Sequence, residues 1–212
     1  MAKLIFSCTF VCDAKDCKQP VACTGTGSAE QNNGVDENGE WAEEVEEIFT
    51  PVFFNPPLRL MDFPASCPAI VSQYLCESFA LAYANPPAAL NAARTALEAL
   101  MNELKVKRFQ VSKSTRRPIS LHNRIKLLPD KFNEEKELLT AVKWLGNSGS
   151  HDGDRASTAD VFVAYEMLEQ ALFGIYDDRS ERLKKVAAKV NRRKGLAGVG
   201  VAGEKKKSKN PG

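Results

Sequence analysis

The feature that most constrains the fold of this chain is an alanine-rich segment from Ala88 to Leu104. Its leucines recur three or four residues apart, so they lie on one side of a helix, and alanine favours the helix more than any other residue. A helix of this length is not stable alone in water, because its apolar stripe must be buried. The segment therefore predicts that other helices pack against it.

Helical spacing continues on both sides of this segment. Ser66 is predicted to cap a first helix, and Ser157 with Asp160 forms the pattern of a capping box before the last one. Antiparallel helices joined by short or medium connections form small bundles. The predicted helices cover residues 66–83, 88–104, 120–128, 134–145 and 157–176.

The first sixty residues have a different pattern. Short runs of β-branched and aromatic residues predict strands, and a polar, glycine-containing loop is expected from Gly25 to Gly39. Asn55-Pro56-Pro57 ends the last run, because proline cannot donate to a strand ladder. The predicted strands cover residues 3–10, 19–24 and 48–54.

These patterns predict a mainly α chain in three parts. A small cysteine-bearing β module with its connector spans 1–62, and an antiparallel helical bundle spans 63–178. A basic amphipathic helix and a flexible tail are expected over 179–212. The chain contains no run of roughly 18 apolar residues and no secretory leader, so we expect a cytoplasmic protein without a membrane span.

Four of the six cysteines lie within sixteen residues of the β module. Thiolates are preferred zinc ligands, and four of them satisfy a tetrahedral structural site. The usual pattern is two tight pairs, however, whereas this is one uneven cluster, and side chains alternate across a strand. Two interpretations stay open: a structural zinc site in a ribbon-like module, or a degenerate ribbon whose thiols only pack. The candidate ligands are Cys8, Cys12, Cys17 and Cys23.

The net charge of +2 conceals a strong asymmetry. From Arg179 to Gly212 there are twelve Lys and Arg residues against two Glu, a net charge of +10, which leaves −8 for the rest. A basic tail on an acidic body indicates a polyanionic partner, although a solvated tail would carry the same charges. A second basic segment, which we expect to be a loop, lies between Val106 and Pro118. The candidate nucleic-acid contacts are Lys107, Arg108, Arg116, Arg117, Arg192, Arg193 and Lys194.

A histidine follows the glycine-rich end of the fourth predicted helix. Lys143 could bind a phosphate there while His151 moves a proton and Asn147 orients the substrate. Helix-stop chemistry explains the same residues, with Gly146 or Gly149 as a left-handed cap. On the alanine-rich helix, Arg94 and Glu98 are four apart and form either a surface ion pair or one wall of the same cleft.

Four segments in this order resemble the bacterial domain of unknown function 4145. The similarity extends from about Phe63 to Tyr176, and members often carry a cysteine-bearing N-terminal segment. That family looks similar to the HEPN helical superfamily and occurs alone or attached to restriction and defence proteins. The resemblance implies a HEPN-like bundle, a zinc-ribbon-like module, a defence-system partner and a possible homodimer. The segments are 92–100, 120–125, 145–151 and 160–168.

Active HEPN ribonucleases pair an arginine with a histidine four to six residues further on. Here the cation is Lys143, and seven residues separate it from His151. We therefore expect a HEPN-like protein that binds nucleic acid, RNA in preference to DNA, or a partner in bacterial defence or restriction. The alternative is a metal-independent endoribonuclease that uses His151 with Asn147, Lys143 and Arg94.

Overall fold

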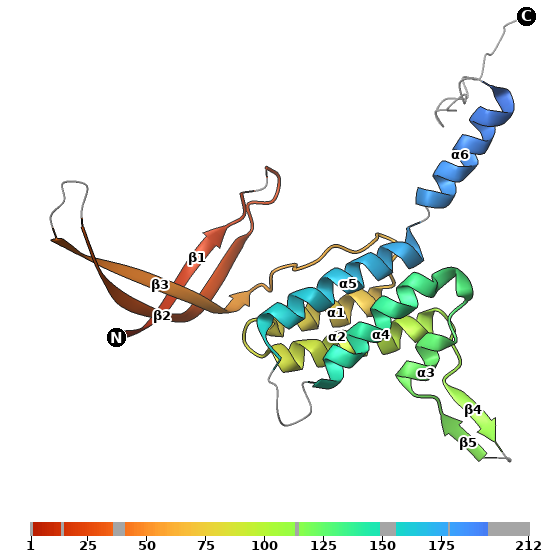
Figure 1. Ribbon diagram of the computed structural model, residues 1–212, viewed down its shortest axis with the longest axis horizontal. Helices are drawn as coiled ribbons and strands as arrows, with labels where there is room; N and C mark the ends of the chain where they lie inside the picture. Colours follow the sequence, from red (N-terminus) through yellow and green to blue (C-terminus); the bar gives the residue numbers. More distant parts are fainter. Residues whose placement is uncertain are drawn as a thin grey trace, which may run out of the picture. The chain divides into compact units, whose positions relative to one another are not determined.

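The computed structural model describes residues 2–13, 15–35, 41–112, 115–148, 156–177 and 179–194. The chain divides into two units, Met1–Tyr176 and Asp177–Gly212. Figure 1 labels the elements along the chain. They are β1 (Ala2–Val11), β2 (Pro20–Val35), β3 (Trp41–Asn55), α1 (Ala69–Leu81), α2 (Pro86–Glu103), β4 (Phe109–Ser112), β5 (Thr115–Pro118), α3 (Leu121–Lys126), the 3-10 turn η1 (Asp130–Phe132), α4 (Asn133–Ser148), α5 (Thr158–Tyr176) and α6 (Arg179–Arg193).

The prediction of a mainly α fold with a small zinc-ribbon-like module is wrong. The first unit combines α-helices with two antiparallel sheets, one of three strands in the order β1-β2-β3 and one of two strands, β4-β5. Much of the loop predicted from Gly25 to Gly39 belongs to β2, which is 16 residues long, and the acidic stretch after it belongs to β3. Backbone pairing between antiparallel strands does not require an apolar face, so polar residues did not reveal these strands.

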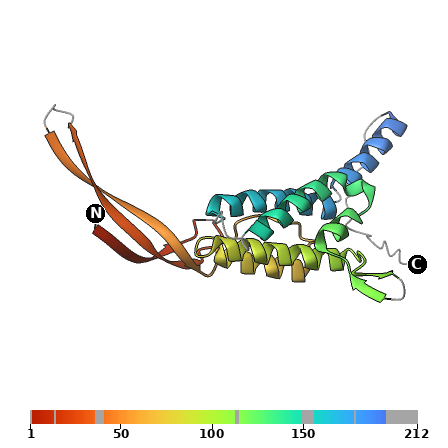
Figure 2. The same cartoon turned by 60° about the horizontal axis from the view of Figure 1, so that its bottom comes forward.

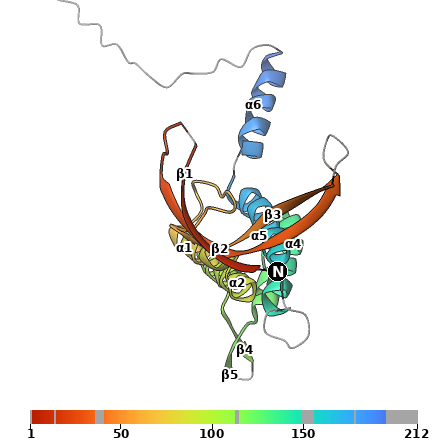
Figure 3. The ribbon, with the colours of Figure 1, turned by 90° about the vertical axis from the view of Figure 1, so that its left-hand side faces the viewer.

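Aromatic rings lie over glycines in the three-stranded sheet. A Cβ atom on Gly25 would lie 2.6 Å from the Phe6 ring, and one on Gly27 would lie 3.0 Å from the Phe49 ring. The two rings meet edge to face with centroids 5.2 Å apart. The register shifts by a bulge between Thr24 and Gly25, and Figure 3 shows how strongly the sheet curves.

Helices α1, α2, α4 and α5 form the helical part of the first unit, with α1 and α2 in one layer and α4 and α5 in the other (Figure 2). Among the described helices, none is long and apolar enough to cross a membrane. The interior is made of leucine, alanine and valine from the faces that helical spacing predicted. Its fully buried side chains include Leu75, Leu90, Leu97, Leu100, Ile125, Leu139, Val142, Leu168 and Leu172.

Two of the predicted helix starts have different outcomes. The capping box is confirmed: the Asp160 backbone N–H donates to Ser157 Oγ at 3.3 Å, and the Ser157 N–H donates to the Asp160 carboxylate at 2.7 Å. The Ser157 hydroxyl also donates to the Asp160 carboxylate at 2.6 Å, and this bond, followed by the one from the Ser157 backbone N–H, lowers the pKa of Asp160. Ser66 does not cap α1, because its hydroxyl instead donates to the Tyr176 carbonyl at 3.0 Å and so ties the connector to the end of α5.

A small polar group lies inside the apolar core. The Ser78 hydroxyl donates to the Ala89 carbonyl at 2.7 Å and lies 2.7 Å from the Tyr165 hydroxyl. Ser78 is completely buried and Tyr165 is 1% exposed. Burial raises the pKa of Tyr165 to about 12, against the opposing effect of its hydrogen bond to Ser78. The hydroxyls therefore satisfy one another and hold α1, α2 and α5 together.

A row of aromatic rings leads from the sheet to this core. Phe54 of β3 meets Tyr83 with ring centroids 5.3 Å apart, and Tyr83 meets Phe162 at 6.0 Å. Phe162 lies 6.4 Å from Tyr165, which in turn meets Phe79 at 5.1 Å. All four contacts are edge to face, the arrangement that aromatic pairs prefer. The sheet is thus joined to the bundle through ring contacts.

Candidate nucleic-acid interface

The two-stranded ribbon of β4 and β5 leaves the bundle at the end of α2. There Lys105 adopts a left-handed backbone conformation with φ of 56°. The Val106 N–H donates to the Met101 carbonyl and the Lys105 N–H to the Asn102 carbonyl, both at 2.9 Å. This pair of bonds ends the helix as a Schellman motif, with lysine where glycine is usual. The chain turns sharply here, and the ribbon extends away from the helices (Figure 1).

A buried arginine holds the base of the ribbon. The Arg124 guanidinium donates to Asn102 Oδ1 at 2.8 Å and to the Val106 carbonyl at 3.1 Å. Burial lowers the pKa of Arg124, the charge of Arg108 lowers it further, and Glu98 opposes both effects. The hydrogen bonds of Arg124 connect α3 to both ends of the turn that precedes the ribbon. The ribbon is therefore anchored at its root although its strands are exposed.

The register of the ribbon gives it two different faces. Phe109 is opposite Pro118 and Val111 is opposite Arg116, so these four side chains lie on one face. The Arg116 guanidinium carbon lies 3.9 Å from the centroid of the Phe109 ring. The other face carries Arg117 opposite Gln110. One face is therefore an arginine–aromatic platform and the other is polar.

The predicted cations of this segment all lie on or beside the ribbon and are exposed. Lys107 and Arg108 precede β4, and Arg116 and Arg117 belong to β5. The remaining predicted contacts are in the second unit. Arg192 and Arg193 are in the last turn of α6, Lys194 follows them, and all three are exposed.

The predicted catalytic residues divide between α2 and α4. Arg94 Nη2 is 3.1 Å from Glu98 Oε1, which is the expected ion pair across one helical turn. Within the described part of the chain, the buried Arg94 Nε has no hydrogen-bond partner. Lys143 is only 8% exposed, and burial lowers its pKa, with a further lowering from the charge of Arg94. The structure thus brings Arg94 and Lys143 close together, while Asn147 lies half-buried one turn after Lys143.

Of the two glycines that the helix-stop interpretation offered as a cap for α4, Gly146 does not end the helix. Helix α4 continues to Ser148, and Gly146 is inside it. A Cβ atom on Gly146 would lie 2.9 Å from Arg94 Cβ and 3.0 Å from the Leu90 carbonyl oxygen, so the glycine lets α4 approach α2 closely. His151 and Gly149 lie outside the described residues.

Two residues that sequence reasoning did not select lie next to Lys143. The Trp144 ring is 5.8 Å from the His122 ring, and the Lys143 ammonium lies 3.0 Å from the centroid of the Trp144 ring. His122 Nδ1 is buried and has no hydrogen-bond partner among the residues that the structure describes. The sequence shows Trp144 directly after the predicted cation Lys143, and this was the available signal for Trp144. The proximity of His122 could not be predicted, because it depends on how α3 packs against α4.

The four candidate metal ligands lie in two separate parts of the β module. Cys8 is directly opposite Cys23 in the sheet, whereas Cys12 and Cys17 lie near the turn between β1 and β2. Four residues of extended chain, as between Cys8 and Cys12, span about 13 Å, far more than one zinc ion can bridge. Burial, followed by the neighbouring Cys8, raises the pKa of Cys23. Within the described ranges, no group of three or more His, Cys, Asp or Glu residues could hold a metal ion, so zinc binding stays a prediction.

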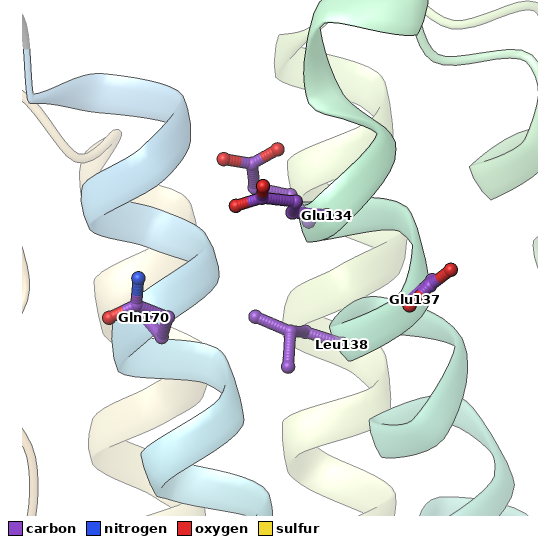
Figure 4. Close-up of a pocket in the computed structure, with 5 residues that line it drawn as sticks. Glu134, Glu137, Leu138 and Gln170 are labelled. Atoms are coloured by element: carbon purple, nitrogen blue, oxygen red, sulfur yellow. The ribbon is translucent and has the colours of Figure 1, made fainter.

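A hollow of about 260 Å³ lies between α4 and α5. Figure 4 shows Leu138 directed from α4 towards α5, whereas Glu137 points away from α5. Carboxylates dominate its lining, which does not suit a polyanion. Its lining residues are Glu134, Glu135, Glu137, Leu138 and Gln170.

Two family models match the chain. The model described as a domain of unknown function (DUF4145) matches residues 77–193, and one described as a domain of unknown function (DUF8608) matches residues 1–54. No curated protein and no solved structure matches the chain. Neither description refers to HEPN ribonucleases or to a zinc ribbon. Because the first match covers more than half of the chain, the predicted resemblance is confirmed, and the chain belongs to the DUF4145 family.

Proposed function

We propose that this protein binds single-stranded nucleic acid, RNA in preference to DNA, through the β4–β5 ribbon. The observation that carries the proposal is the Arg116 guanidinium stacked on the exposed Phe109 ring, 3.9 Å from its centroid. Unpaired bases are recognised by stacking on aromatic rings and on arginine planes. The cations Lys107, Arg108 and Arg117 supply the phosphate contacts on and beside the same ribbon.

The anchoring of the ribbon supports this role. Because Arg124 and the Schellman motif hold its root, binding does not have to order the whole ribbon, and less conformational entropy is lost. α6 adds a second basic surface with Arg192 and Arg193.

The first test is fluorescence anisotropy with a labelled twelve-nucleotide RNA and with DNA of the same sequence, at several salt concentrations. The double substitution of Arg116 and Arg117 by alanine is expected to weaken binding at least about fivefold, because a stacking contact is lost. The slope of log affinity against log salt should fall by about 0.7 for each phosphate contact removed. Arg116→Lys keeps the charge but loses the planar face of the guanidinium. We therefore expect this variant to keep the wild-type salt slope while its affinity falls.

The matched control is Arg59→Ala. Arg59 also stacks on a phenylalanine, 4.4 Å from the Phe63 ring centroid, but it lies outside the ribbon and pairs with Asp62 at 3.2 Å. This variant should bind RNA as the wild type does. An equal loss in both variants, or no binding by the wild-type protein, would overturn the proposal, and the second result would direct the search to a defence-system protein as the partner.

The endoribonuclease alternative is supported by one observation, the proximity of Arg94 and Lys143. Two cations at this position could stabilise a phosphate while His151 transfers a proton. Cleavage of the same RNA in the presence of a chelator, with cyclic phosphate ends and loss of activity in His151→Ala, would support it. Equal cleavage by His151→Ala would exclude this role of the histidine.

A further inference from the structure

A second hollow lies on the outer face of α4. It is a shallow, open depression of about 370 Å³ lined by side chains of α4, with Trp144 at one end. A helical side chain leans towards the N-terminus of its helix, so the indole lies over the preceding turn. Trp144 is 55% exposed, an unusual position for the largest side chain in proteins. The lining residues are Lys136, Glu137, Thr140, Ala141 and Trp144.

Side chains of both charges lie around the indole, because Glu137 lines the hollow together with Lys136. The Lys143 ammonium lies 3.0 Å from the ring centroid, and the His122 ring lies 5.8 Å away with its plane tilted by 51°. Lys136 stands on the rim of the hollow and is 3.3 Å from the Asp130 carboxylate. An exposed aromatic ring is a surface on which an unpaired nucleobase stacks.

This hollow is also connected to the ribbon. Pro118 ends β5, and α3 begins three residues later at Leu121, so His122 lies just beyond the root of the ribbon. The ring contact between His122 and Trp144 then continues this surface onto α4. A strand bound along β5 would therefore be directed towards the indole.

Resting on the nucleic-acid binding proposed above, we infer that Trp144 and the hollow before it are a seat for one unpaired nucleobase of the strand that lies on the ribbon. The base stacks on the indole, over the helical turn that carries Ala141. A duplex cannot use this seat, because the faces of its bases are covered by their neighbours. The seat therefore makes the protein selective for single-stranded RNA or for an unpaired loop.

The experiment uses the full chain with Trp41→Phe, so that Trp144 is the single tryptophan. Its fluorescence and the anisotropy of a labelled oligouridine twelve-mer are followed in parallel titrations. We expect saturable quenching that follows the anisotropy, and no quenching by an RNA duplex of equal length. Trp144→Ala should weaken binding by about 5- to 150-fold, the range for loss of one base-stacking contact.

Ala141→Met provides a second variant, which keeps the indole but fills the hollow. It should reduce both quenching and affinity, while Arg116→Ala should shift the quenching curve to higher RNA concentration and leave its final amplitude unchanged. Binding without quenching, with full affinity in Trp144→Ala, would overturn the seat and leave the ribbon proposal intact. Absence of any anisotropy change would overturn the ribbon proposal itself, so the two failures are distinguishable.

Discussion

Replacing Tyr165 with alanine is expected to lower the free energy of unfolding by about 3–5 kcal/mol. The side chain is 1% exposed, meets the Phe79 ring at 5.1 Å and lies 2.7 Å from the Ser78 hydroxyl. Its removal leaves a cavity where α1 and α5 meet, because surrounding helices relax only in part. Urea denaturation followed by circular dichroism at 222 nm measures the effect.

Two milder variants separate the ring from the hydroxyl. Tyr165→Phe should cost only about 1 kcal/mol, because Ser78 keeps its bond to the Ala89 carbonyl. Ser78→Ala should lower the free energy of unfolding by about 1–3 kcal/mol, because the buried Tyr165 hydroxyl then loses Ser78 as its partner. If Tyr165→Ala is as stable as Tyr165→Phe, the Tyr165 ring is not part of the core.

The tyrosine also makes stability depend on alkaline pH. Its pKa is about 12 in the folded protein and about 10 in an unfolded chain, so the unfolded state loses this proton first. Stability is therefore full below pH 10 and declines as the pH rises towards 12. Tyr165→Phe should show a smaller decline over this range.

The second large effect is expected at Gly146, where alanine should lower the free energy of unfolding by about 1–3 kcal/mol. The new methyl group would lie 2.9 Å from Arg94 Cβ and 3.0 Å from the Leu90 carbonyl, so α2 and α4 must separate. Alanine favours a helix by about 1 kcal/mol over glycine, and this gain offsets only part of the cost. Thermal and urea denaturation report the net change.

Gly174→Ala is the matched control in α5. There a methyl group would collide with the Glu135 carboxylate, which is the far end of a long side chain and can move. This variant should be as stable as the wild type or up to about 1 kcal/mol more stable. Equal losses at the two glycines would mean that the collision with the α2 backbone does not set the cost at Gly146.

The helices could be predicted from sequence because helical spacing depends on local side-chain order. Ser157 and Asp160 likewise act within one turn, so their capping box was recognisable. The long strands were not, because Gly25 and Gly27 indicate a loop until Phe6 and Phe49 are known to lie across them. Ser66 was misread because its partner, the Tyr176 carbonyl, is 110 residues away.

The site divides in the same way. The cations Arg116 and Arg117 were predicted from local charge alone. The stacking of Arg116 on Phe109 could be recognised only from the register of β4 and β5. The sequence of this segment did not predict these strands. His122 and Trp144 are 22 residues apart in the sequence and belong to different helices. Only the packing of the bundle brings their rings together.

The row of rings from Phe54 to Tyr165 has a consequence for how the first unit melts. Since the Phe54 ring packs edge to face against Tyr83, the sheet cannot detach without exposing the Tyr83 ring. Tyr83 in turn packs against Phe162 beside Tyr165, so we expect detachment also to weaken the helices. Sheet and bundle should consequently melt as one cooperative unit, although their secondary structures are different and each is assembled from its own stretch of chain.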